Sequence, residues 1–453
     1  MKLDSIEIEN FKLFKHEKFE FNSNFNLIIG INGSGKTSLL NAVAVAVAGW
    51  AHSYIANDNN LRPIEDNEIR EIQIDQRFDK TKETRIKAVG KALVVSPLGK
   101  CDEGIALWQR TRKEGSSKTI TSAEMRYAYP AGGGFSDKSY NVRFEVLTNK
   151  IFNYIENKNH FDLPIIAFYE CNRLWKTIEK IDIEETATLR HSRFDPYIDC
   201  FHTGSDDKAI GQWLLSEKLI SLDEGRDTQV LKAIKYAAIS ALENCSDFKF
   251  DFKEKRVMVE FDNGSAIPFE HLSDGQRTIL GLFCDIARRA AILNPHLGGE
   301  ASEKVKGVVL IDELDLHLHP KWQRRIIEDL RRVFPNIQFI CTTHSPFLIQ
   351  SLRSSEELIM LNGEPLSQYS NLGIEEISKN MGVERPDVSI NYEKMKTIAK
   401  SFLQELDEMD NTPEEKQEKF RERLASKIAP FADNPAYQAF LELKYAAKTG
   451  KDL

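Results

Sequence analysis

The residues best suited to binding a phosphate group stand near the start of the chain. Residues 30–37 read Gly-Ile-Asn-Gly-Ser-Gly-Lys-Thr and follow the apolar, strand-like run 25–29. A glycine-rich loop that opens a helix directs free backbone N–H groups and the positive helix end toward one anion. In this pattern Lys36 reaches the β- and γ-phosphates of a nucleotide, and the hydroxyl of Thr37 binds Mg²⁺. We call residues 30–37 the phosphate loop; alone, it could also be a glycine-rich turn without a ligand. The expected nucleotide contacts here are Asn32, Gly33, Ser34, Gly35, Lys36, Thr37 and Ser38.

Two further groups of polar residues end apolar, strand-like runs much later in the chain. The run 308–312 ends in adjacent carboxylates, Asp312 and Glu313, and the run 337–342 is soon followed by His344. At the tip of a buried strand beside the loop, Asp312 would complete the ligand shell of Mg²⁺. Glu313 could polarise an attacking water, and His344 could hydrogen-bond the γ-phosphate and hold that water. A lone histidine at a strand end is more often structural, so the case for His344 depends on the other groups.

A fourth group begins a helix. It consists of Leu272, Ser273, Asp274, Gly275 and Gln276, which we call the signature segment, and a helical pattern of apolar residues follows it. A serine and a glycine at a helix start again form an anion site. Four such groups in order, each expected at a strand or helix end, favour nucleoside triphosphate hydrolysis.

In this order the four groups resemble the ATP-binding-cassette (ABC) ATPases, in the soluble branch that includes the RecF, SMC and OLD proteins. The resemblance implies that the signature segment is the family's signature motif and that Asp315 lies in the D-loop after the Walker B strand. In that family the signature of one subunit binds the γ-phosphate held by the phosphate loop of another. The resemblance therefore implies a homodimer, or a larger assembly built from it, with ATP and Mg²⁺ in two composite sites. Asp274 stands where transporters usually have glycine, as is common in the RecF-like branch.

Two weaker correspondences concern the N-terminal half. The segment Asn10-Phe11-Lys12 resembles one that these ATPases place beside the nucleotide, so we expect a nucleotide contact from Lys12. The glutamine of the family's Q-loop stays open between Gln73 and Gln109, which both lie on strand-like segments.

Further segments resemble one compact group of these proteins. Residues 313–320 closely resemble the run after Walker B in bacterial ATPases of the RecF/OLD type. Residues 166–169, 173–175 and 432–441 are similar to the PtuA-like ATPase subunits of Septu antiphage systems and to retron-associated ATPases. In the Septu group a separate HNH nuclease cuts nucleic acid, so the resemblance implies such a partner. The chain after His344 is helical and charged, without the strand-borne acidic cluster that a Toprim nuclease needs for two metals. We therefore expect that this chain is not itself a nuclease.

The elements that must position these groups predict an α/β fold. We expect an ABC-ATPase (P-loop NTPase) head with a mixed or parallel core sheet, an antiparallel β lobe and helical insertions. The run 163–168 predicts a central buried strand. The expected segments are the N-terminal part of the core (1–50), a β-rich lobe or insertion (51–160), a strand plus helical insertion (161–247), the C-terminal part of the core (248–370) and a helical C-terminal region (371–453). In the last region Tyr437, Phe440, Leu441 and Tyr445 form one helical stripe, which either packs on its own domain or docks the nuclease.

Composition and charge limit which partners and which cellular compartment are expected. The formal net charge of −8 gives no overall attraction for nucleic acid, so binding would need a local patch. The basic stretches 80–91 and 110–113 could supply that patch, although a solvated face is the favoured interpretation. Six scattered cysteines without a C-x-x-C pair favour a reducing cytoplasm over a disulfide framework or zinc cluster. The longest apolar run, 42–51, is too short to span a membrane, and no signal peptide is expected.

Three functions fit these observations. The favoured one is an ATPase subunit that controls a partner nuclease in bacterial antiphage defence. The alternatives are a RecF-like DNA-repair or DNA-clamping ATPase, and a scaffold gated by nucleotide. The sequence separates all three from transporters that carry their own transmembrane helices.

Overall fold

The computed structural model describes residues 1–51, 61–74, 77–95, 101–131, 134–140, 161–171, 192–198, 200–201, 207–361, 372–381, 397–404, 406 and 435–449. The chain forms two compact units, Met1–Ile377 and Ser378–Leu453. The division into five segments is finer than this and stays a prediction. Residues 173–175, residues 432–434 and the side chain of Tyr437, which entered the sequence analysis, lie outside the described part.

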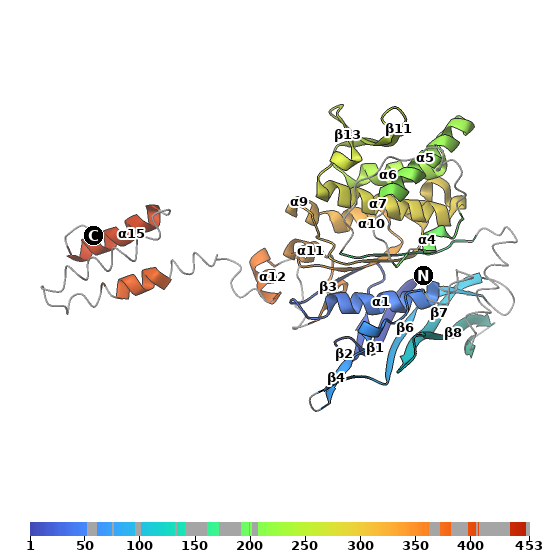
Figure 1. Ribbon diagram of the computed structural model, residues 1–453, viewed down its shortest axis with the longest axis horizontal. Coiled ribbons are helices and arrows are strands. Elements are labelled where there is room, and N and C mark those ends of the chain that lie inside the picture. Colours follow the sequence, from blue (N-terminus) through green and yellow to red (C-terminus); the bar gives the residue numbers. More distant parts are fainter. Residues whose placement is uncertain are drawn as a thin grey trace. The chain divides into compact units, whose positions relative to one another are not determined.

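A five-stranded parallel sheet carries the phosphate loop (Figure 1). Its strands are β3 (Phe25–Ile29), β10 (Ile165–Tyr169), β14 (Gly307–Ile311), β15 (Ile337–Thr342) and β16 (Leu358–Met360), in the order β10-β14-β15-β3-β16. All but β16 are buried along their whole length, which explains their continuous apolar runs. Strand β10 is buried as predicted, but it ends the strand order instead of lying at its centre. Because the strands are parallel, their carboxyl ends share one edge, where ligands bind in such sheets.

A six-stranded antiparallel sheet forms the β lobe. Its order is β2-β1-β6-β7-β8-β9, with β1 (Lys2–Phe11), β2 (Phe14–Glu20), β6 (Glu83–Val95), β7 (Cys101–Lys113), β8 (Ile120–Ala131) and β9 (Gly134–Tyr140). The N-terminal hairpin therefore belongs to the same sheet as the lobe strands. Two small antiparallel sheets are β4 (Glu71–Ile74) with β5 (Arg77–Lys80), and β11 (Cys245–Asp251) with β12 (Arg256–Phe261) and β13 (Ala266–Pro268). The predicted fold class, a P-loop ATPase head with a parallel core sheet, an antiparallel lobe and helical insertions, is confirmed.

Helix α1 (Lys36–Ala51) packs between the two large sheets (Figure 1), so its sequence is apolar on all sides. Two polar side chains of β7 bind its carbonyl groups: Trp108 Nε1 donates to Ala46 O at 2.7 Å, and Arg110 Nη1 donates to Val45 O at 3.2 Å. Arg110 is buried, and burial lowers the pKa of its guanidinium to about 10. The interpretation of residues 110–113 as a solvated or phosphate-binding face is therefore wrong for Arg110, because its guanidinium donates to the backbone carbonyls of Val45 in α1 and of Leu61.

A buried glutamine joins the two large sheets. Gln338 of β15 accepts from Leu3 N at 2.7 Å and donates to Leu3 O at 2.8 Å, and Leu3 belongs to β1 of the lobe. Its amide also donates to Asn22 O at 2.8 Å. A fully satisfied buried amide fixes the register of the groups that it bonds. The lobe is thereby held against the sheet that carries the phosphate loop.

Helices cover the other face of the core sheet (Figure 1). The longer ones are α5 (Asp207–Glu224), α6 (Gln229–Ala241), α7 (Asp274–Leu293) and α10 (Ile326–Val333). The shorter ones are α4 (Asp195–Ile198), α8 (Ala301–Lys304), α9 (Pro320–Gln323) and α11 (Pro346–Gln350). Helix α12 (Ile374–Asn380) spans the boundary between the two units in the sequence. The 3₁₀ turns are η1 (Asp66–Glu68), η2 (Phe269–His271), η3 (Pro295–Glu300) and η4 (Ser355–Glu357).

The second unit contains helix α15 (Pro435–Thr449). Leu441 and Tyr445 of α15 pack in a small core that also holds Phe402. This packing confirms the prediction that the aromatic stripe serves its own domain for these two residues, whereas Phe440 is 46% exposed. Among the residues that the structure describes, no helix combines the length and the apolarity needed to cross a bilayer.

Candidate nucleotide-binding site

The phosphate loop connects β3 to α1, and its geometry depends on glycine. Gly33 and Gly35 have φ values of 80° and 102°, a region that side chains disfavour. Lys36 folds back over the loop, and its Nζ donates to Gly30 O at 2.8 Å and to Ile31 O at 3.2 Å. Burial lowers the pKa of Lys36, while Asp312, Glu313 and Asp315 act in the opposite direction. Asn32 and Gly33 are exposed, and Ser34 and Ser38 are half-buried.

The loop has the features of a phosphate cradle. Within the described part of the chain, Ser34 Oγ is a buried hydroxyl without a hydrogen-bond partner. A buried polar atom of this kind is costly unless a ligand or water satisfies it. With the lysine ammonium and the glycine-rich backbone, this donor set fits phosphate oxygens.

The acidic residue Asp312 lies between two hydroxyl groups. Thr37 Oγ1 lies 3.2 Å from Asp312 Oδ2, and Thr342 Oγ1 donates to Asp312 Oδ1 at 2.5 Å. Strand β15, which carries Thr342, separates β14 from β3 in the sheet. A hydroxyl and a carboxylate at this distance suit the oxygen coordination of Mg²⁺. The structure thus brings together Thr37 and Asp312, the two residues predicted to hold the metal.

Glu313 adopts a left-handed backbone conformation beside Asp312. Its φ is 50°, which costs a non-glycine residue about 1–2 kcal/mol. Two bonds to Thr342 hold this conformation: Glu313 N donates to its hydroxyl at 2.7 Å, and Leu314 N donates to its carbonyl at 2.9 Å. Backbone strain of this kind is concentrated at functional sites. Here the strained residue follows directly after Asp312, just beyond the end of β14.

Asp315, the expected D-loop residue, is hydrogen-bonded to the residues that follow β15. Its Oδ1 accepts from Thr343 Oγ1 at 2.6 Å and from His344 N at 3.3 Å. The side chain of His344 is exposed at this edge. The Asp312–Asp315 segment and the His344 segment therefore form one hydrogen-bonded surface.

Lys12 lies in the β1–β2 turn, which packs on the phosphate loop. A Cβ on Gly35 would lie 3.1 Å from Phe14 Cζ and 3.5 Å from Leu13 Cδ1. Lys12 Nζ itself lies 3.5 Å from Glu68 Oε1, and Glu68 is buried in an ion pair with Arg62. The turn is next to the loop as expected, but the ammonium of Lys12 faces a carboxylate in this state.

The signature segment caps helix α7. Ser273 Oγ accepts from Gln276 N at 3.4 Å, and Ser273 N donates to Gln276 Oε1 at 3.1 Å, which is a capping box. Ser273 and Asp274 are exposed, whereas Leu272 and Gly275 are buried. A Cβ on Gly275 would lie 2.6 Å from His317 O, so only glycine fits where α7 meets the segment after the D-loop. Within the described residues, no hydrogen bond or ion pair joins the signature segment to the phosphate loop.

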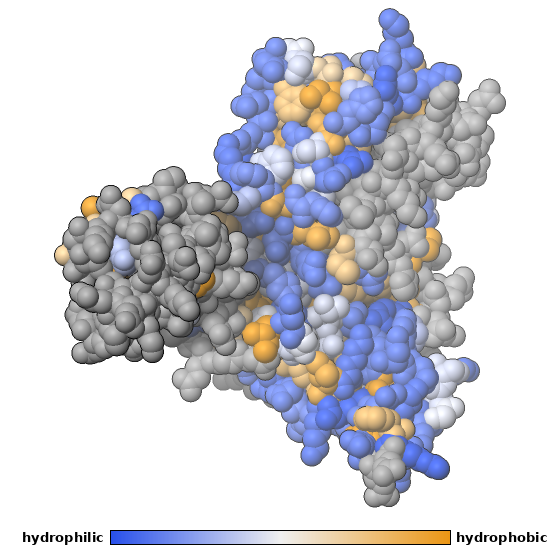
Figure 2. All heavy atoms as spheres, turned by 60° about the vertical axis from the view of Figure 1, so that its left-hand side comes forward, coloured by the Kyte–Doolittle hydropathy of each residue, from blue (hydrophilic) through white to orange (hydrophobic). Residues whose placement is uncertain are grey.

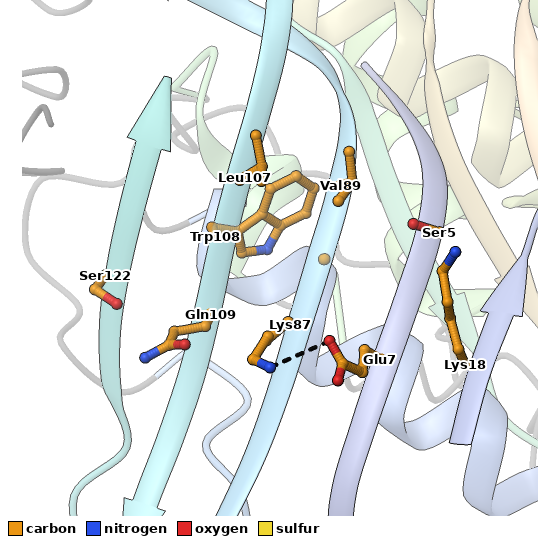
Figure 3. A pocket seen from close by; sticks show the side chains of 10 residues that line it. Ser5, Glu7, Lys18, Lys87, Val89, Leu107, Trp108, Gln109 and Ser122 are labelled. Atoms are coloured by element: carbon orange, nitrogen blue, oxygen red, sulfur yellow. Dashed lines mark hydrogen bonds and ion pairs between the residues drawn. The ribbon is translucent and has the colours of Figure 1, made fainter. Parts of the chain in front are cut away.

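A hollow of about 440 Å³ lies on the β lobe, apart from these groups (Figure 3). Its lining comes from β1, β2, β6, β7 and β8 and consists of Ser5, Glu7, Lys18, Lys87, Ala88, Val89, Leu107, Trp108, Gln109 and Ser122. Gln109, one candidate for the Q-loop glutamine, therefore belongs to this hollow. The other candidate, Gln73, lies on β4 opposite Phe78.

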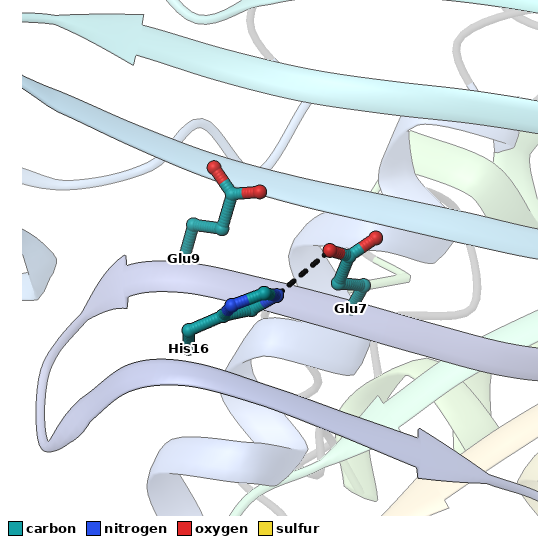
Figure 4. A group of neighbouring side chains, drawn as sticks. All are labelled: Glu7, Glu9 and His16. Carbon is teal, nitrogen blue, oxygen red and sulfur yellow. Dashed lines mark hydrogen bonds and ion pairs between the residues drawn. The ribbon is translucent and has the colours of Figure 1, made fainter.

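Glu7 also takes part in a cluster with Glu9 and His16, whose ligand atoms lie within 4.8 Å of one another (Figure 4). His16 Nε2 lies 2.8 Å from Glu7 Oε1, and Lys87 Nζ lies 3.2 Å from both glutamates. The hydrogen bonds from His16 and then Lys87 lower the pKa of Glu7. Arg85 binds the second oxygen of Glu9, so cations already balance these carboxylates. The cluster is therefore an ion-pair network on the surface of the lobe.

Thr342 is the site residue that the sequence analysis missed. It stood in the run before His344 without a role, although its hydroxyl bonds to both Asp312 and Glu313. The pairing of Ile311 with Cys341 explains this, because the following residues of β14 and β15 then lie side by side. A threonine after a buried apolar strand is a weak signal until that strand is known to pair with the acidic one.

Comparison with known proteins identifies the family. A family model described as "AAA ATPase domain" matches residues 1–181, and one described as "AAA domain, putative AbiEii toxin, Type IV TA system" matches residues 133–350. The Retron Vc95 probable ATPase of Vibrio cholerae is 30% identical over 387 residues, which is 80% of this chain and 74% of that protein. This chain belongs to the retron ATPase family.

The chain is also similar to a Septu protein and to solved SMC head structures. The Septu protein PtuA of Bacillus mycoides is 25% identical over 383 residues, which is 81% of this chain and 41% of that protein. The resemblance to retron and Septu ATPases is thus confirmed. Among solved structures, an SMC head bound to the C-winged helix domain of ScpA is 14% identical, covers 80% of this chain and 94% of its own, and aligns with a TM-score of 0.42.

Replacing Thr342 by valine tests the site directly. Thr342→Val keeps the side-chain shape but removes the donor to Asp312 and the acceptor for Glu313 N, so both acidic residues lose their orientation. We expect kcat for ATP hydrolysis to fall roughly 10- to 100-fold, with a higher Mg²⁺ requirement. The control is Thr119→Val, which removes a hydroxyl that accepts from Ile64 N at 2.8 Å in the lobe. Unchanged turnover and Mg²⁺ dependence in Thr342→Val would contradict this assignment.

Proposed function

We propose that this chain is the ATP-binding and ATP-hydrolysing subunit of a bacterial antiphage defence system, and that it controls a separate nuclease through an ATP-sandwiched homodimer. The observation that carries the hydrolytic part is the joined set of Thr37, Asp312 and Glu313, in which Thr342 bonds to both acidic residues. The names of the relatives, a retron ATPase and a Septu protein, support the defence context.

Substrate binding in this proposal starts at the phosphate loop. Its backbone N–H groups and Lys36 bind the β- and γ-phosphates of ATP. Lys36 must then exchange its bonds to Gly30 O and Ile31 O for bonds to phosphate oxygens. The Lys36 ammonium is already partly removed from water by burial. Exchanging its carbonyl partners for phosphate oxygens therefore adds little further desolvation cost.

Hydrolysis needs the carboxyl edge of the sheet. Thr37 and Asp312 would hold Mg²⁺, which neutralises charge on the phosphates when bound. Glu313 orients the attacking water and accepts its proton as the oxygen bonds to the γ-phosphorus and the bond to ADP breaks. His344 contacts the γ-phosphate from the end of β15. Asp315 links this histidine to the acidic segment through its bond to His344 N.

The second half of each site comes from another copy. Ser273 and Asp274 stand exposed at the positive end of α7, which suits contact with a γ-phosphate. The phosphate loop and the signature segment share no bond within the described part of one chain. Two copies in opposite orientation would place each signature segment on the loop of the other. The dimer, or a larger assembly built from it, is thus the proposed unit of hydrolysis.

The proposed partner is a separate HNH-type nuclease, as the resemblance to the Septu ATPase subunits implies. Phe440 is exposed on α15 while Leu441 of the same helix is buried, so Phe440 is available for such a partner.

We propose the cytoplasm as the compartment. Six cysteines scattered along the sequence without a C-x-x-C pair support a reducing compartment.

Trapping the nucleotide tests the composite site. Glu313→Gln should bind ATP but lose turnover by about 100-fold or more, because the water is no longer activated. A closed site then retains ATP, so we expect slow dissociation of a fluorescent ATP analogue. Adding Ser273→Arg should leave binding intact but restore fast dissociation, since the arginine blocks the approach of the second copy.

Lys36→Ala is the control that should bind no nucleotide, and Lys18→Ala is the matched change of a surface lysine, which pairs with Glu20. Fast dissociation from Glu313→Gln alone would contradict the sandwich. Normal turnover in the same variant would contradict the role of Glu313.

The defence role predicts a nuclease that this chain binds. Expressed with the product of the neighbouring gene, the chain should co-purify with an HNH protein, and Lys36→Ala should alter its cleavage of nucleic acid. Tight binding to gapped DNA without any nuclease partner would favour the RecF-like alternative. A partner whose activity ignores both Lys36→Ala and Glu313→Gln would contradict control by ATP.

A further inference from the structure

Helix α7 is bonded in its interior to the last residue of strand β10. Tyr169 Oη donates to Asp285 Oδ2 at 2.8 Å, and Asp285 also accepts from Arg289 Nε at 2.7 Å and Arg288 Nη2 at 2.6 Å. Tyr169, Asp285 and Arg289 are all buried. Arg289 in turn donates to Pro196 O at 2.6 Å, so the network reaches α4 as well.

The charges in this network are fixed by their partners. Burial alone would raise the pKa of Asp285, but Arg289 and Arg288 hold it well below its usual range. Burial raises the pKa of Tyr169, so its hydroxyl keeps the proton that it donates. A buried ion pair contributes little to stability compared with an apolar pair of the same size, but its geometry is directional. Its presence therefore favours a role in fixing the orientation of α7.

The same tyrosine reaches the catalytic edge through its backbone. Tyr169 O accepts from Asp312 N at 2.8 Å. One residue thus bonds to the main chain of the Mg²⁺ carboxylate and, through its side chain, to the signature helix. The distance along α7 from the signature segment to Asp285 is about 17 Å, or three turns of a helix that moves as a rigid body.

A second contact ties the front of α7 to the same edge. The backbone of Gly275 lies so close to His317 O that a Cβ would approach it to 2.6 Å. Helix α7 therefore has two contacts near this edge: Gly275 at its start lies against His317 O, and Asp285 in its middle bonds to Tyr169. If a second copy displaces Ser273, α7 carries Asp285 with it. The hydrogen bond from Tyr169 Oη to Asp285 is then strained.

We propose that Tyr169, Asp285 and Arg289 are positioning residues that couple the two ATP sites of the dimer. In each chain they connect the signature segment, which serves the site on the second copy, with Asp312, which serves the chain's own site. ATP captured at one site then aligns the metal carboxylate at the other, and hydrolysis becomes cooperative. This inference rests on the composite sites of the proposed function and adds the route by which they communicate.

The test removes one hydroxyl. Tyr169→Phe keeps the ring, and Asp285 remains paired with Arg288 and Arg289, so the fold is retained. The rate of ATP hydrolysis by the full chain is measured against ATP concentration at excess Mg²⁺. With two coupled sites we expect a Hill coefficient between 1 and 2 for the unmodified chain. Tyr169→Phe should lower it to about 1 and reduce kcat roughly three- to ten-fold.

The matched control is Tyr197→Phe. Tyr197 is equally buried and donates to Pro164 O at 2.6 Å, so it loses a comparable bond outside the link between Asp312 and α7. Both variants should lower the melting temperature by similar amounts, but Tyr197→Phe should keep the Hill coefficient of the unmodified chain. Equal Hill coefficients in the two variants would overturn the inference, as would hyperbolic kinetics in the unmodified chain.

The rate at which bound ATP dissociates distinguishes failure of the coupling inference from failure of the proposed function. In the Glu313→Gln background, Tyr169→Phe should still dissociate ATP slowly, because the sandwich itself is intact. If retention is slow and the Hill coefficient is unaffected by Tyr169→Phe, only the coupling is wrong. If Glu313→Gln alone retains no ATP, the composite site is wrong, and the coupling inference, which depends on it, is wrong as well.

Discussion

The bond between Asp312 and Thr342 is the interaction on which the site depends. Thr342 holds the carboxylate toward Thr37 and also accepts from Glu313 N, which keeps the glutamate in a left-handed conformation. In the proposed mechanism, one hydroxyl thus separates the tasks of two adjacent acids, metal binding by Asp312 and activation of water by Glu313. The arrangement requires that β15 lie between β14 and β3, and the parallel order of the core sheet supplies this.

The antiparallel lobe supports this edge from outside. Gln338 joins β15 to β1, so the strand that carries Thr342 is also bonded to the N-terminal hairpin. The hairpin turn packs on Gly35 of the phosphate loop. Helix α1 lies between both sheets, and buried groups from β7 bind its carbonyls. The loop is therefore held from the sheet, the helix and the lobe, which limits its motion before a nucleotide arrives.

The sequence predicted the parts of this site that are local. A loop of fixed spacing, two acids after an apolar strand and a capped helix can each be recognised within about ten residues. Contacts between distant segments could not be predicted: the register that sets Thr342 beside Asp312 and the link from Tyr169 to Asp285 both need the tertiary fold. Charge pattern also misled at Arg110, because a buried guanidinium bound to backbone carbonyls has the same sequence signature as a surface one.

A crosslink between two copies tests the central claim most directly, which is that the phosphate loop of one chain meets the signature segment of another. One copy would carry Asn32→Cys and the other Ser273→Cys, both in a Glu313→Gln background with Cys101 and Cys171 replaced by serine. The account predicts that a short bismaleimide joins the two copies when ATP and Mg²⁺ are present, and not without nucleotide. Bound ATP without any crosslink between positions 32 and 273 would contradict it.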